Sequence, residues 1–395
     1  MIDFTYTEEQ QALQKTARDF AQKEIKPIAT ARDRIADPND ITLWDVMAKA
    51  ADLGFTKMLR PEALGGSGVG IMEWCIVLEE FAAADVGFAM AFTLIDIVAM
   101  LILQHGNEEQ REKLLGPILG ECLHVGAIAF SEPDRAGSDM MCPDPQATPG
   151  FSTCARRDGD HFVINGKKTV WVTNCGAQTQ SFIIVAHTDP AKPQDLSFFY
   201  VPRGTPGLSV GEQIDKIGAR LADHAQVVLE DVRVPASNLI GAEGKAVDAL
   251  IPGMVASNIA VGAVALGVSR AAYDYALEYA RHRMSWGQPI INHQAIAMKL
   301  ADMHIDQEQI RFLTLNAAWA CDTQPPSVVQ LRKAATVKVA SSEMAVRVTE
   351  AAMNVLGAYG LSKEYPVEKW HRDALSGPIE DVHNIIWRLR IATQL

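Results

Sequence analysis

The stretch CARRDGDHFVINGKKTVWVTN, residues 154–174, interrupts a chain whose other parts read as helical. Apolar residues alternate with polar ones, and an Asp-Gly and an Asn-Gly pair stand between the alternating runs. This combination is a strong β-hairpin signal, because both dipeptides favour tight turns. The short β-rich runs SFIIVAHT, LSFFYVP and AQVVLEDVRVP follow at regular intervals. The middle of the chain therefore predicts a small β-barrel or sandwich.

The regions on both sides of this block predict helices. Thr7 and Gln10 form a capping-box pattern ahead of a run with helical spacing, and the last third contains long amphipathic and Ala-rich runs. We therefore expect an α+β fold that is mostly α. It would comprise a helical N-terminal domain over residues 1–125, a β-domain over 126–238 and a C-terminal helical bundle over 239–395.

Composition narrows the class of function. The net charge of −12 argues against a nucleic-acid groove and against an anionic membrane surface, since both need clustered Lys and Arg. We find no run of the roughly 18 apolar residues that a membrane span needs, so none is expected. The six cysteines are scattered without a CxxC pair. Such cysteines are typical of reduced thiols in a cytoplasm, not of a disulfide framework or a metal site.

Two pairs of side chains suit a flat, phosphorylated ligand. Trp171 and Thr173 lie on the same side of the predicted strand, where an indole can stack on a ring and a hydroxyl can bind its rim. Trp171 could equally be a core residue of the β-domain. Arg283 and Trp286, near the end of one helix, could hold a phosphate and stack an adenine. Alternatively, Arg283 is simply a favourable cation at a helix C-terminus.

The segment GPIEDVHN, residues 377–384, raises a question of catalysis. It places Glu380 and Asp381 side by side, two residues before His383. One of the acids could be a catalytic base, or both could be solvated charges on a surface turn. If the turn is helical, successive side chains point about 100° apart, so only one acid can face a given ligand.

Six segments in this order resemble the acyl-CoA dehydrogenase family over essentially the whole chain. They are PEALGGSG, SEPDRAGSD, INGKKTVWVTN, DKIGARLADHAQVVLEDVRVPASNLIG, RHRMSWGQPIINHQAIAMKLADM and LGAYGLSKEYPVEKWHRDA. The resemblance implies FAD bound between the β-domain and the bundle, and α,β-dehydrogenation of an acyl-CoA thioester to a trans-2-enoyl-CoA with hydride transfer to flavin N5. It also implies an electron-transfer flavoprotein as acceptor, a homotetramer and a role in acyl-CoA or fatty-acid catabolism.

The resemblance also assigns cofactor contacts. Ile128 and Ser131 would lie along the flavin edge, Trp171 would pack on the ring, and Thr173 would hydrogen-bond near N5. Arg283 and Trp286 would reach the pyrophosphate and adenine of a neighbouring subunit's FAD. The remaining expected FAD contacts are Gln294, Asn354, Gly357, Ala358 and His383, of which Asn354 stands where the family usually has Gln.

The family's base is a glutamate in a Y-E-G-T turn after RDA, and counting from residues 372–374 places Asp381 there. Glu380 replaces the tyrosine, and it is the alternative base. The family's second base position falls on Ser257, so no acid stands there. Aspartate is one methylene shorter than glutamate, and a displacement of about 1 Å can change a rate on the order of a hundredfold.

Three residues are expected at the substrate. The resemblance places Ser138 at the pantetheine and Asn258, usually Arg, beside the acyl-CoA. Asp96 stands in an apolar run that matches the acyl pocket. It could meet a cationic or hydroxylated acyl group, although a paired or surface Asp is the preferred interpretation. Two other functions stay open: a nitroalkane-oxidase-like flavoprotein, whose relatives use an aspartate base, and one subunit of a heteromeric dehydrogenase.

Overall fold

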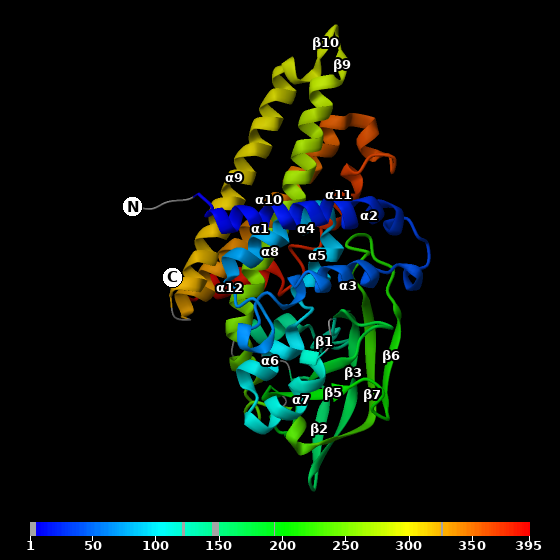
Figure 1. Ribbon diagram of the computed structural model, residues 1–395, viewed down its shortest axis with the longest axis vertical. Coiled ribbons are helices and arrows are strands. Elements are labelled where there is room, and N and C mark those ends of the chain that lie inside the picture. The colour runs from blue at the N-terminus through cyan, green and yellow to red at the C-terminus, as the bar shows by residue number, and fades with distance from the viewer. Residues whose placement is uncertain (1–4, 121–122, 144–149, 193, 325–326) are drawn as a thin grey trace.

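The computed structural model describes residues 5–120, 123–143, 150–192, 194–324 and 327–395. Its elements follow one another as helices, then strands, then helices again, and each group gathers in its own part of the molecule (Figure 1). The strands form the lower part in this view, and the long helices extend to the opposite end.

The N-terminal part is a set of short helices. Its first helix begins at the predicted capping box: the Gln10 amide donates to Thr7 Oγ1 at 3.2 Å, and the Thr7 amide donates to Gln10 Oε1 at 3.1 Å. The helices are α1 (Glu8–Phe20), α2 (Lys26–Asp33), α3 (Trp44–Asp52), α4 (Ile71–Ala84), α5 (Val86–Thr93), α6 (Ile97–His105) and α7 (Glu108–Gly120).

The middle part is one eight-stranded sheet. Strands β6-β7-β3-β2-β4-β5-β8 follow in that order, and β1 pairs with β4 in parallel. Side chains from six strands form one core cluster, so the sheet curls around its own interior. The other face of β4 and β5 packs against α6 and α7. The strands are β1 (Gly126–Ala129), β2 (Cys154–Asp158), β3 (His161–Thr173), β4 (Ser181–His187), β5 (Leu196–Pro202), β6 (Leu208–Gln213), β7 (His224–Pro235) and β8 (Leu239–Ile240).

The C-terminal part is built around α8, whose centre is buried on nearly all sides. Gly267 permits this packing, because a Cβ there would lie 2.3 Å from the backbone oxygen of Glu79 on α4. The elements are α8 (Ala246–His282), the hairpin β9 (Met284–Ser285) and β10 (Gln288–Pro289), α9 (Gln294–Thr323), α10 (Val328–Leu356), α11 (Val367–Ala374) and α12 (Asn384–Ala392).

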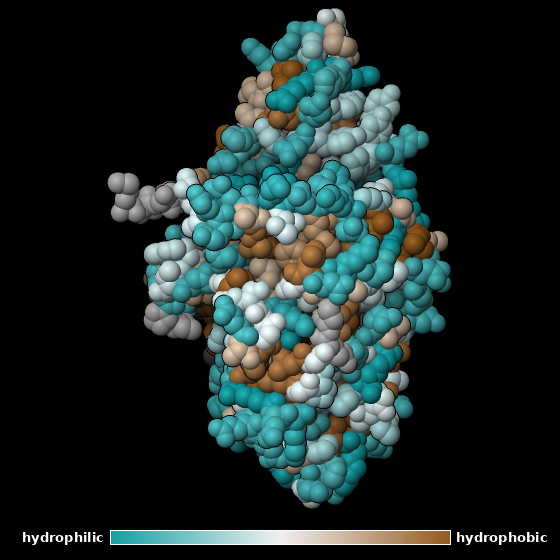
Figure 2. All heavy atoms as spheres, in the orientation of Figure 1, coloured by the Kyte–Doolittle hydropathy of each residue, from teal (hydrophilic) through white to brown (hydrophobic). Residues whose placement is uncertain are grey.

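The expectation that no segment could span a membrane needs a correction. Residues Val86–His105 and Ala246–His282 are each long and apolar enough by length and composition alone. The first contains two helices, α5 and α6, separated by turn residues. More than half of each apolar window is buried inside the protein, as in core helices that pass the same test. Figure 2 shows that the face toward the viewer is mostly hydrophilic, with brown patches below α1 and around α6.

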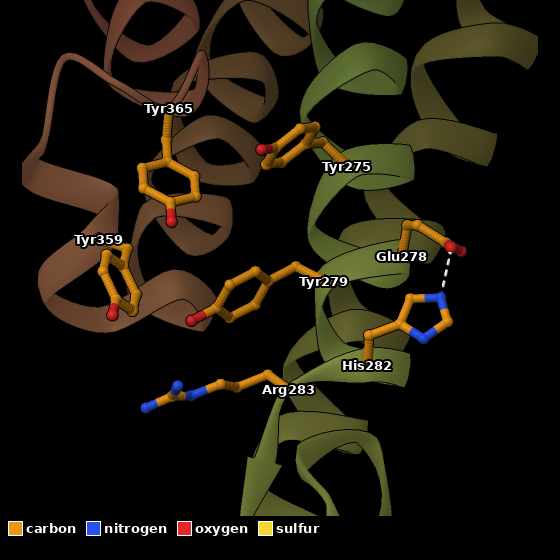
Figure 3. A pocket seen from close by; sticks show the side chains of 7 residues that line it. All are labelled: Tyr275, Glu278, Tyr279, His282, Arg283, Tyr359 and Tyr365. Atoms are coloured by element: carbon orange, nitrogen blue, oxygen red, sulfur yellow. Dashed lines mark hydrogen bonds and ion pairs between the residues drawn. The ribbon is translucent and has the colours of Figure 1, made fainter.

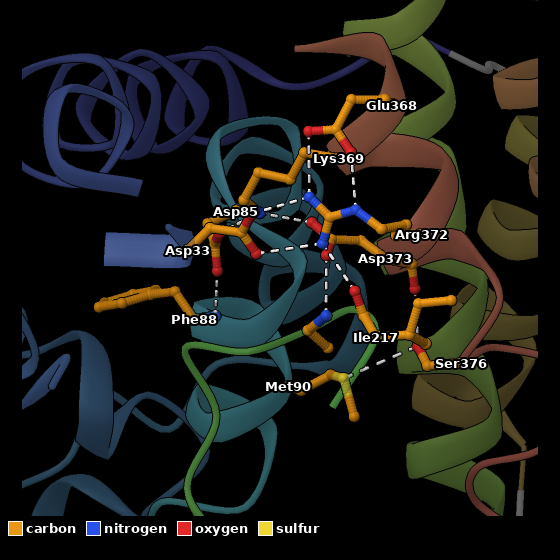
Figure 4. A network of polar contacts seen from close by, with 11 residues as sticks. Asp33, Asp85, Phe88, Met90, Ile217, Glu368, Lys369, Arg372, Asp373 and Ser376 are labelled. Carbon is orange, nitrogen blue, oxygen red and sulfur yellow. Dashed lines mark hydrogen bonds and ion pairs between the residues drawn. The ribbon is translucent and has the colours of Figure 1, made fainter. Parts of the chain in front are cut away.

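A buried ion network joins the three parts of the chain (Figure 4). Lys369 Nζ contacts Asp85 Oδ2 at 2.6 Å and Asp373 Oδ2 at 2.5 Å, and all three side chains are buried. The other oxygen of Asp373 accepts from the backbone N–H of Ala219 in the β-domain at 2.7 Å. Two acids share one lysine, so the network holds α5, α11 and the Ala219 loop in one arrangement.

Candidate active site

One wall of the site is the end of β3. Trp171 is 57% exposed, whereas its neighbour Val172 on the other face of the strand is buried. Thr173 pairs with His224 of β7, and its Oγ1 lies 3.0 Å from His224 Nε2. The Trp171 and His224 rings meet edge to face at 6.0 Å. Trp171 and Thr173 therefore share one face, as predicted, and the alternative interpretation of Trp171 as a core residue is wrong.

His224 and Lys216 extend this wall and were not singled out from the sequence. Burial, and then the nearby Lys216 ammonium, lower the pKa of His224 to about 3, so its imidazole is neutral. Lys216 Nζ lies 2.8 Å from Nδ1. Nδ1 also lies 3.1 Å from the backbone oxygen of Ala222, but Lys216 Nζ donates to that oxygen as well. Because an ammonium can only donate, we assign Nδ1 as acceptor from Lys216 and Nε2–H as donor to Thr173 Oγ1. This assignment leaves the Thr173 hydroxyl proton free to donate to a ligand.

The segment from Ile128 to Ser138 runs alongside β3. Ile128 is half-buried on β1, and Ser131 Oγ accepts from the Gly137 amide at 2.9 Å. The buried pair of Glu132 and Lys168, at 3.0 Å, fastens this loop to β3. Burial alone would raise the pKa of Glu132, but Lys168 and hydrogen bonds from residues 152 and 153 lower it to about 2. The loop is therefore rigidly placed at the edge of the Trp171 surface.

The acid pair lies in a turn between α11 and α12, and the turn is not helical. Asp381 and Val382 have positive φ angles of 47° and 70°. Asp381 Oδ1 accepts from Ser257 Oγ of α8 at 3.1 Å. Asp381 Oδ2 and Glu380 Oε2 are buried and have no hydrogen-bond partner within the described chain. The family resemblance assigned Asp381 and Ser257 to two separate base positions. In the structure the two side chains form a hydrogen bond.

Both acids are less acidic than usual. Burial raises the pKa of Asp381 to about 6 and that of Glu380 to about 7, while the Lys338 ammonium opposes the shift in both. A carboxyl group whose pKa lies near the working pH is suited to accept a proton. The turn and the Trp171 wall belong to one region, because the loop that carries Lys216 docks through Ala219 on Asp373 of α11. A base and a surface for a flat ring therefore lie together.

Two of the expected substrate residues are already engaged within the protein. Asp96 forms a bidentate pair with Arg60, which is 2% exposed, through its Nε at 3.1 Å and its Nη2. This pairing was the preferred interpretation, and it leaves no free carboxylate for a substrate cation. The Asn258 amide nitrogen donates to Met254 of its own helix at 2.6 Å. Ser138 is half-buried in the loop beside β3.

The other expected FAD residues gather at the opposite end of the molecule. Arg283, Tyr279 and Tyr359 line a cavity of about 440 Å³ with Tyr275, Glu278, His282 and Tyr365 (Figure 3). The Arg283 guanidinium lies 5.7 Å from the centre of the Tyr359 ring. Gly357 and Ala358 directly precede Tyr359, and Asn354 lies in the last turn of α10, which ends at Leu356. The cavity thus places Arg283 beside Tyr359, the residue that follows the expected FAD contacts Gly357 and Ala358.

Three further predicted contacts line neither the Trp171 wall nor the Arg283 cavity. Trp286 is 96% exposed at the tip of the β9–β10 hairpin, with φ of 50°. Gln294 is exposed at the start of α9. His383 caps α12, because its Nδ1 accepts from the Ile385 amide at 3.1 Å. The β9–β10 hairpin, which directly follows Arg283, lies at the end of the molecule opposite the strands of the β-domain (Figure 1).

The residues fit FAD on these observations. Trp171 offers an open aromatic face beside a free hydroxyl proton on Thr173, which suits a flavin ring and its polar rim. Arg283, in a tyrosine-lined cavity, suits a pyrophosphate with an adenosine beside it. Thr173 and His224 were separated in the sequence by fifty residues, and only strand pairing could have linked them.

Comparison with known proteins agrees with this geometry. Models of the acyl-CoA dehydrogenase N-terminal, middle and C-terminal domains match residues 7–121, 127–232 and 251–395. The probable acyl-CoA dehydrogenase YngJ of Bacillus subtilis is 35% identical over 100% of both chains. Butyryl-CoA dehydrogenase from Megasphaera elsdenii has a TM-score of 0.89 and 32% identity, covering 100% of this chain and 99% of that one.

A further solved chain comes from work on the electron transferring flavoprotein of Acidaminococcus fermentans and flavin-based electron bifurcation. It has a TM-score of 0.88 and 30% identity, and the match covers 100% of this chain and 99% of that one. The matches in sequence and in fold both extend over essentially the full length of this chain. This chain belongs to the acyl-CoA dehydrogenase family of FAD-dependent enzymes.

Proposed function

We propose that this enzyme removes the α-proton of an acyl-CoA thioester with the carboxylate of Asp381 and forms a trans-2-enoyl-CoA. One observation carries the proposal: Asp381 has one oxygen bound by Ser257 and a second, buried oxygen without a partner among the described residues. An oriented carboxylate with a free oxygen is what proton abstraction requires. Bound FAD supplies the acceptor for the hydride that leaves the β-carbon.

The chain's own residues would prepare this step in two ways. Trp171 and Thr173 orient the flat ring on the β-domain side, and the Lys216–His224 pair directs the Thr173 proton outward. On the other side, burial keeps water from Asp381 and raises its pKa to about 6, so the group is ionised at neutral pH but more basic than a free aspartate. Glu380 is a neighbour in this scheme and not the base.

Two substitutions test the assignment of the base. We expect Asp381→Asn to slow anaerobic flavin bleaching by butyryl-CoA about 10²–10⁴-fold, the usual contribution of a general base. Glu380→Gln should retain most of the rate. Both changes preserve side-chain volume and remove one ionisable group, so each is the control for the other. The reverse result would assign the proton abstraction to Glu380.

A substrate panel separates the remaining functions. The panel contains acyl-CoAs of varied length, branching and charge. Rapid flavin bleaching by an acyl-CoA supports the dehydrogenase activity, whereas flavin bleaching by nitroethane alone would show that the enzyme is a nitroalkane oxidase instead. A colourless protein that gains activity only with a second, different chain would make it half of a heteromeric enzyme. The same panel identifies the acyl group.

We further propose a homotetramer that passes electrons to an electron-transfer flavoprotein in the cytoplasm. Arg283 directly precedes the β9–β10 hairpin, at the end of the molecule opposite the sheet, so a second copy would complete each FAD site in this proposal. Exposed apolar residues recur every seven positions along α9, at Met298, Ile305, Phe312 and Trp319. The cysteines of the described chain are free thiols, as suits a reducing compartment; Cys122 lies outside the described residues.

A further inference from the structure

Lys338 of α10 is a buried cation that hydrogen-bonds to the turn that carries Glu380 and Asp381. Its relative exposure is 0%. Its ammonium donates to the backbone oxygen of Val382 at 2.7 Å, to Asn384 Oδ1 at 2.7 Å and to the backbone oxygen of Pro378 at 3.3 Å. An ammonium has three N–H donors, so all of them are engaged. No carboxylate of the described chain forms an ion pair with it, which is unusual for a lysine at this depth.

The turn needs an external support. Asp381 and Val382 both adopt left-handed backbone conformations, which are unfavourable for side-chain-bearing residues and most of all for a β-branched valine. Lys338 binds a carbonyl on each side of the acid pair, at Pro378 and at Val382. Trp387 Nε1 holds the intervening carbonyl of Asp381 at 3.1 Å. Lys338 therefore closes the turn from within the bundle.

The same ammonium is the cation that most strongly opposes the raised pKa of two adjacent, half-buried acids, Glu380 and Asp381. Two neighbouring carboxylates in a low-dielectric site repel each other, and a cation between them and the bundle favours their ionised forms. Glu343 of α10 also faces Lys338, but Arg388 of α12 binds it at 2.7 Å through two parallel contacts. Lys216 faces Glu380 from the β-domain side. Lys338 is thus the cation that acts on both acids from the bundle side.

We propose that Lys338 is a positioning residue for the reaction: it holds the left-handed turn that aims Asp381 and provides the charge that keeps Asp381 ionised at neutral pH. The proposal rests on the proposed function, because it takes Asp381 as the base. It assigns to a third element, α10, a role in proton abstraction through the turn, because Lys338 is fully buried and hydrogen-bonds to Pro378, Val382 and Asn384.

The test is the pH profile of anaerobic flavin reduction by butyryl-CoA, or by whichever acyl-CoA of the panel reacts fastest. Lys338→Met removes the charge and keeps the apolar stem. We expect a slower reaction at neutral pH and an acidic limb displaced upward by about one to three pH units, the usual effect of losing a neighbouring opposite charge. Lys338→Arg keeps the charge, so its limb should stay near the wild-type position. Lys333→Met, five residues earlier on the same helix, is the matched control and should behave as the wild type.

Each other outcome overturns the proposal. If Lys338→Met lowers the rate at every pH without displacing the acidic limb, the lysine has only a structural role. If the pH profile is unchanged, Lys338 neither positions the turn nor keeps Asp381 ionised. If Lys338→Met does not fold, Lys338→Gln, which keeps hydrogen-bond donors without the charge, must show the displaced limb. Asp381→Asn is measured in parallel: if it still reduces flavin, the proposed base itself is wrong, whereas an inactive Asp381→Asn with an unaffected Lys338→Met rejects only the role of Lys338.

Discussion

At the scale of single residues, the acid pair shows what a resemblance can locate and what it cannot. Counting from the RDA segment places the base at Asp381. In the structure, Ser257 donates a hydrogen bond to one oxygen of Asp381, and the other carboxylate oxygen is buried without a partner among the described residues. The left-handed backbone at Asp381 and the buried Lys338 beneath it leave no local signal in the sequence. They depend on helices that lie more than forty residues away.

The raised pKa of Asp381 should lower the free energy of unfolding at neutral pH. Its pKa in the folded protein is about 6, above the usual 3.8, so the folded state binds the proton more tightly. Stability contributed by this group is therefore present at low pH and lost as pH rises from about 4 to 6. We expect Asp381→Asn to raise the free energy of unfolding at pH 7.5 by about 1–3 kcal/mol, and by much less at pH 4.

Thermal unfolding of the two proteins at both pH values measures this difference. Asp302→Asn on α9 is the control, because Asp302 is exposed and the same change there should have no pH-dependent effect. An Asp381→Asn protein that is less stable than the wild type at pH 7.5 would contradict the prediction, because it would mean that ionised Asp381 stabilises the fold.

At the scale of elements, periodicity predicted most of the outline. The run after the Thr7–Gln10 capping box is a helix, as predicted, and the Cys154–Asn174 stretch forms the β2–β3 hairpin. Alternation correctly placed Trp171 and Thr173 on one face. Alternation could not reveal His224, because His224 lies on β7, the second strand that pairs with β3. This pairing joins segments distant in sequence and depends on the closure of the sheet around its core.

The exposed stripe on α9 gives a prediction for assembly. Its four apolar residues repeat at seven positions, the spacing of a helix face that packs against another helix. We expect Ile305→Glu to weaken the oligomer, because it places a charge within an apolar contact. His304→Glu, on the adjacent and also exposed position, should leave assembly unchanged.

Sedimentation velocity over a range of concentrations distinguishes the two variants. FAD content provides a second readout, since a dissociated subunit would lack the contribution of its neighbour's Arg283 cavity. A tetrameric, yellow Ile305→Glu protein would show that this face of α9 is not part of the interface.

At the scale of the whole molecule, the Lys369 network couples the three parts of the chain to the active site. Burial alone would lower the pKa of Lys369, but Asp373 and Asp85 raise it overall, so the lysine is charged. Lys369→Met should lower the free energy of unfolding by about 3–5 kcal/mol, because it leaves two buried acids without their cation. Lys363→Met, at an exposed position just before α11, should change it by no more than about 0.5 kcal/mol.

The loss in Lys369→Met should depend on pH. Burial already raises the pKa of Asp373 while Lys369 opposes the shift, so loss of the lysine should raise this pKa further and stability should fall as pH increases. The deficit measured by thermal unfolding should therefore be larger at pH 8 than at pH 5. A deficit that is equal at both values would mean that the two acids do not depend on this lysine for their charge.

The sequence by itself determined the order of helices, sheet and bundle, the family, and the position of Asp381, because periodicity, turn dipeptides and motif order are local properties of the chain. Only the tertiary structure decided the pairing of Asp381 with Ser257, the relay from Lys216 through His224 to Thr173, the engagement of Asp96 by Arg60, and the support of the turn by Lys338. Each of these joins residues distant in sequence, and burial of both partners in one place sets their contact and their pKa values.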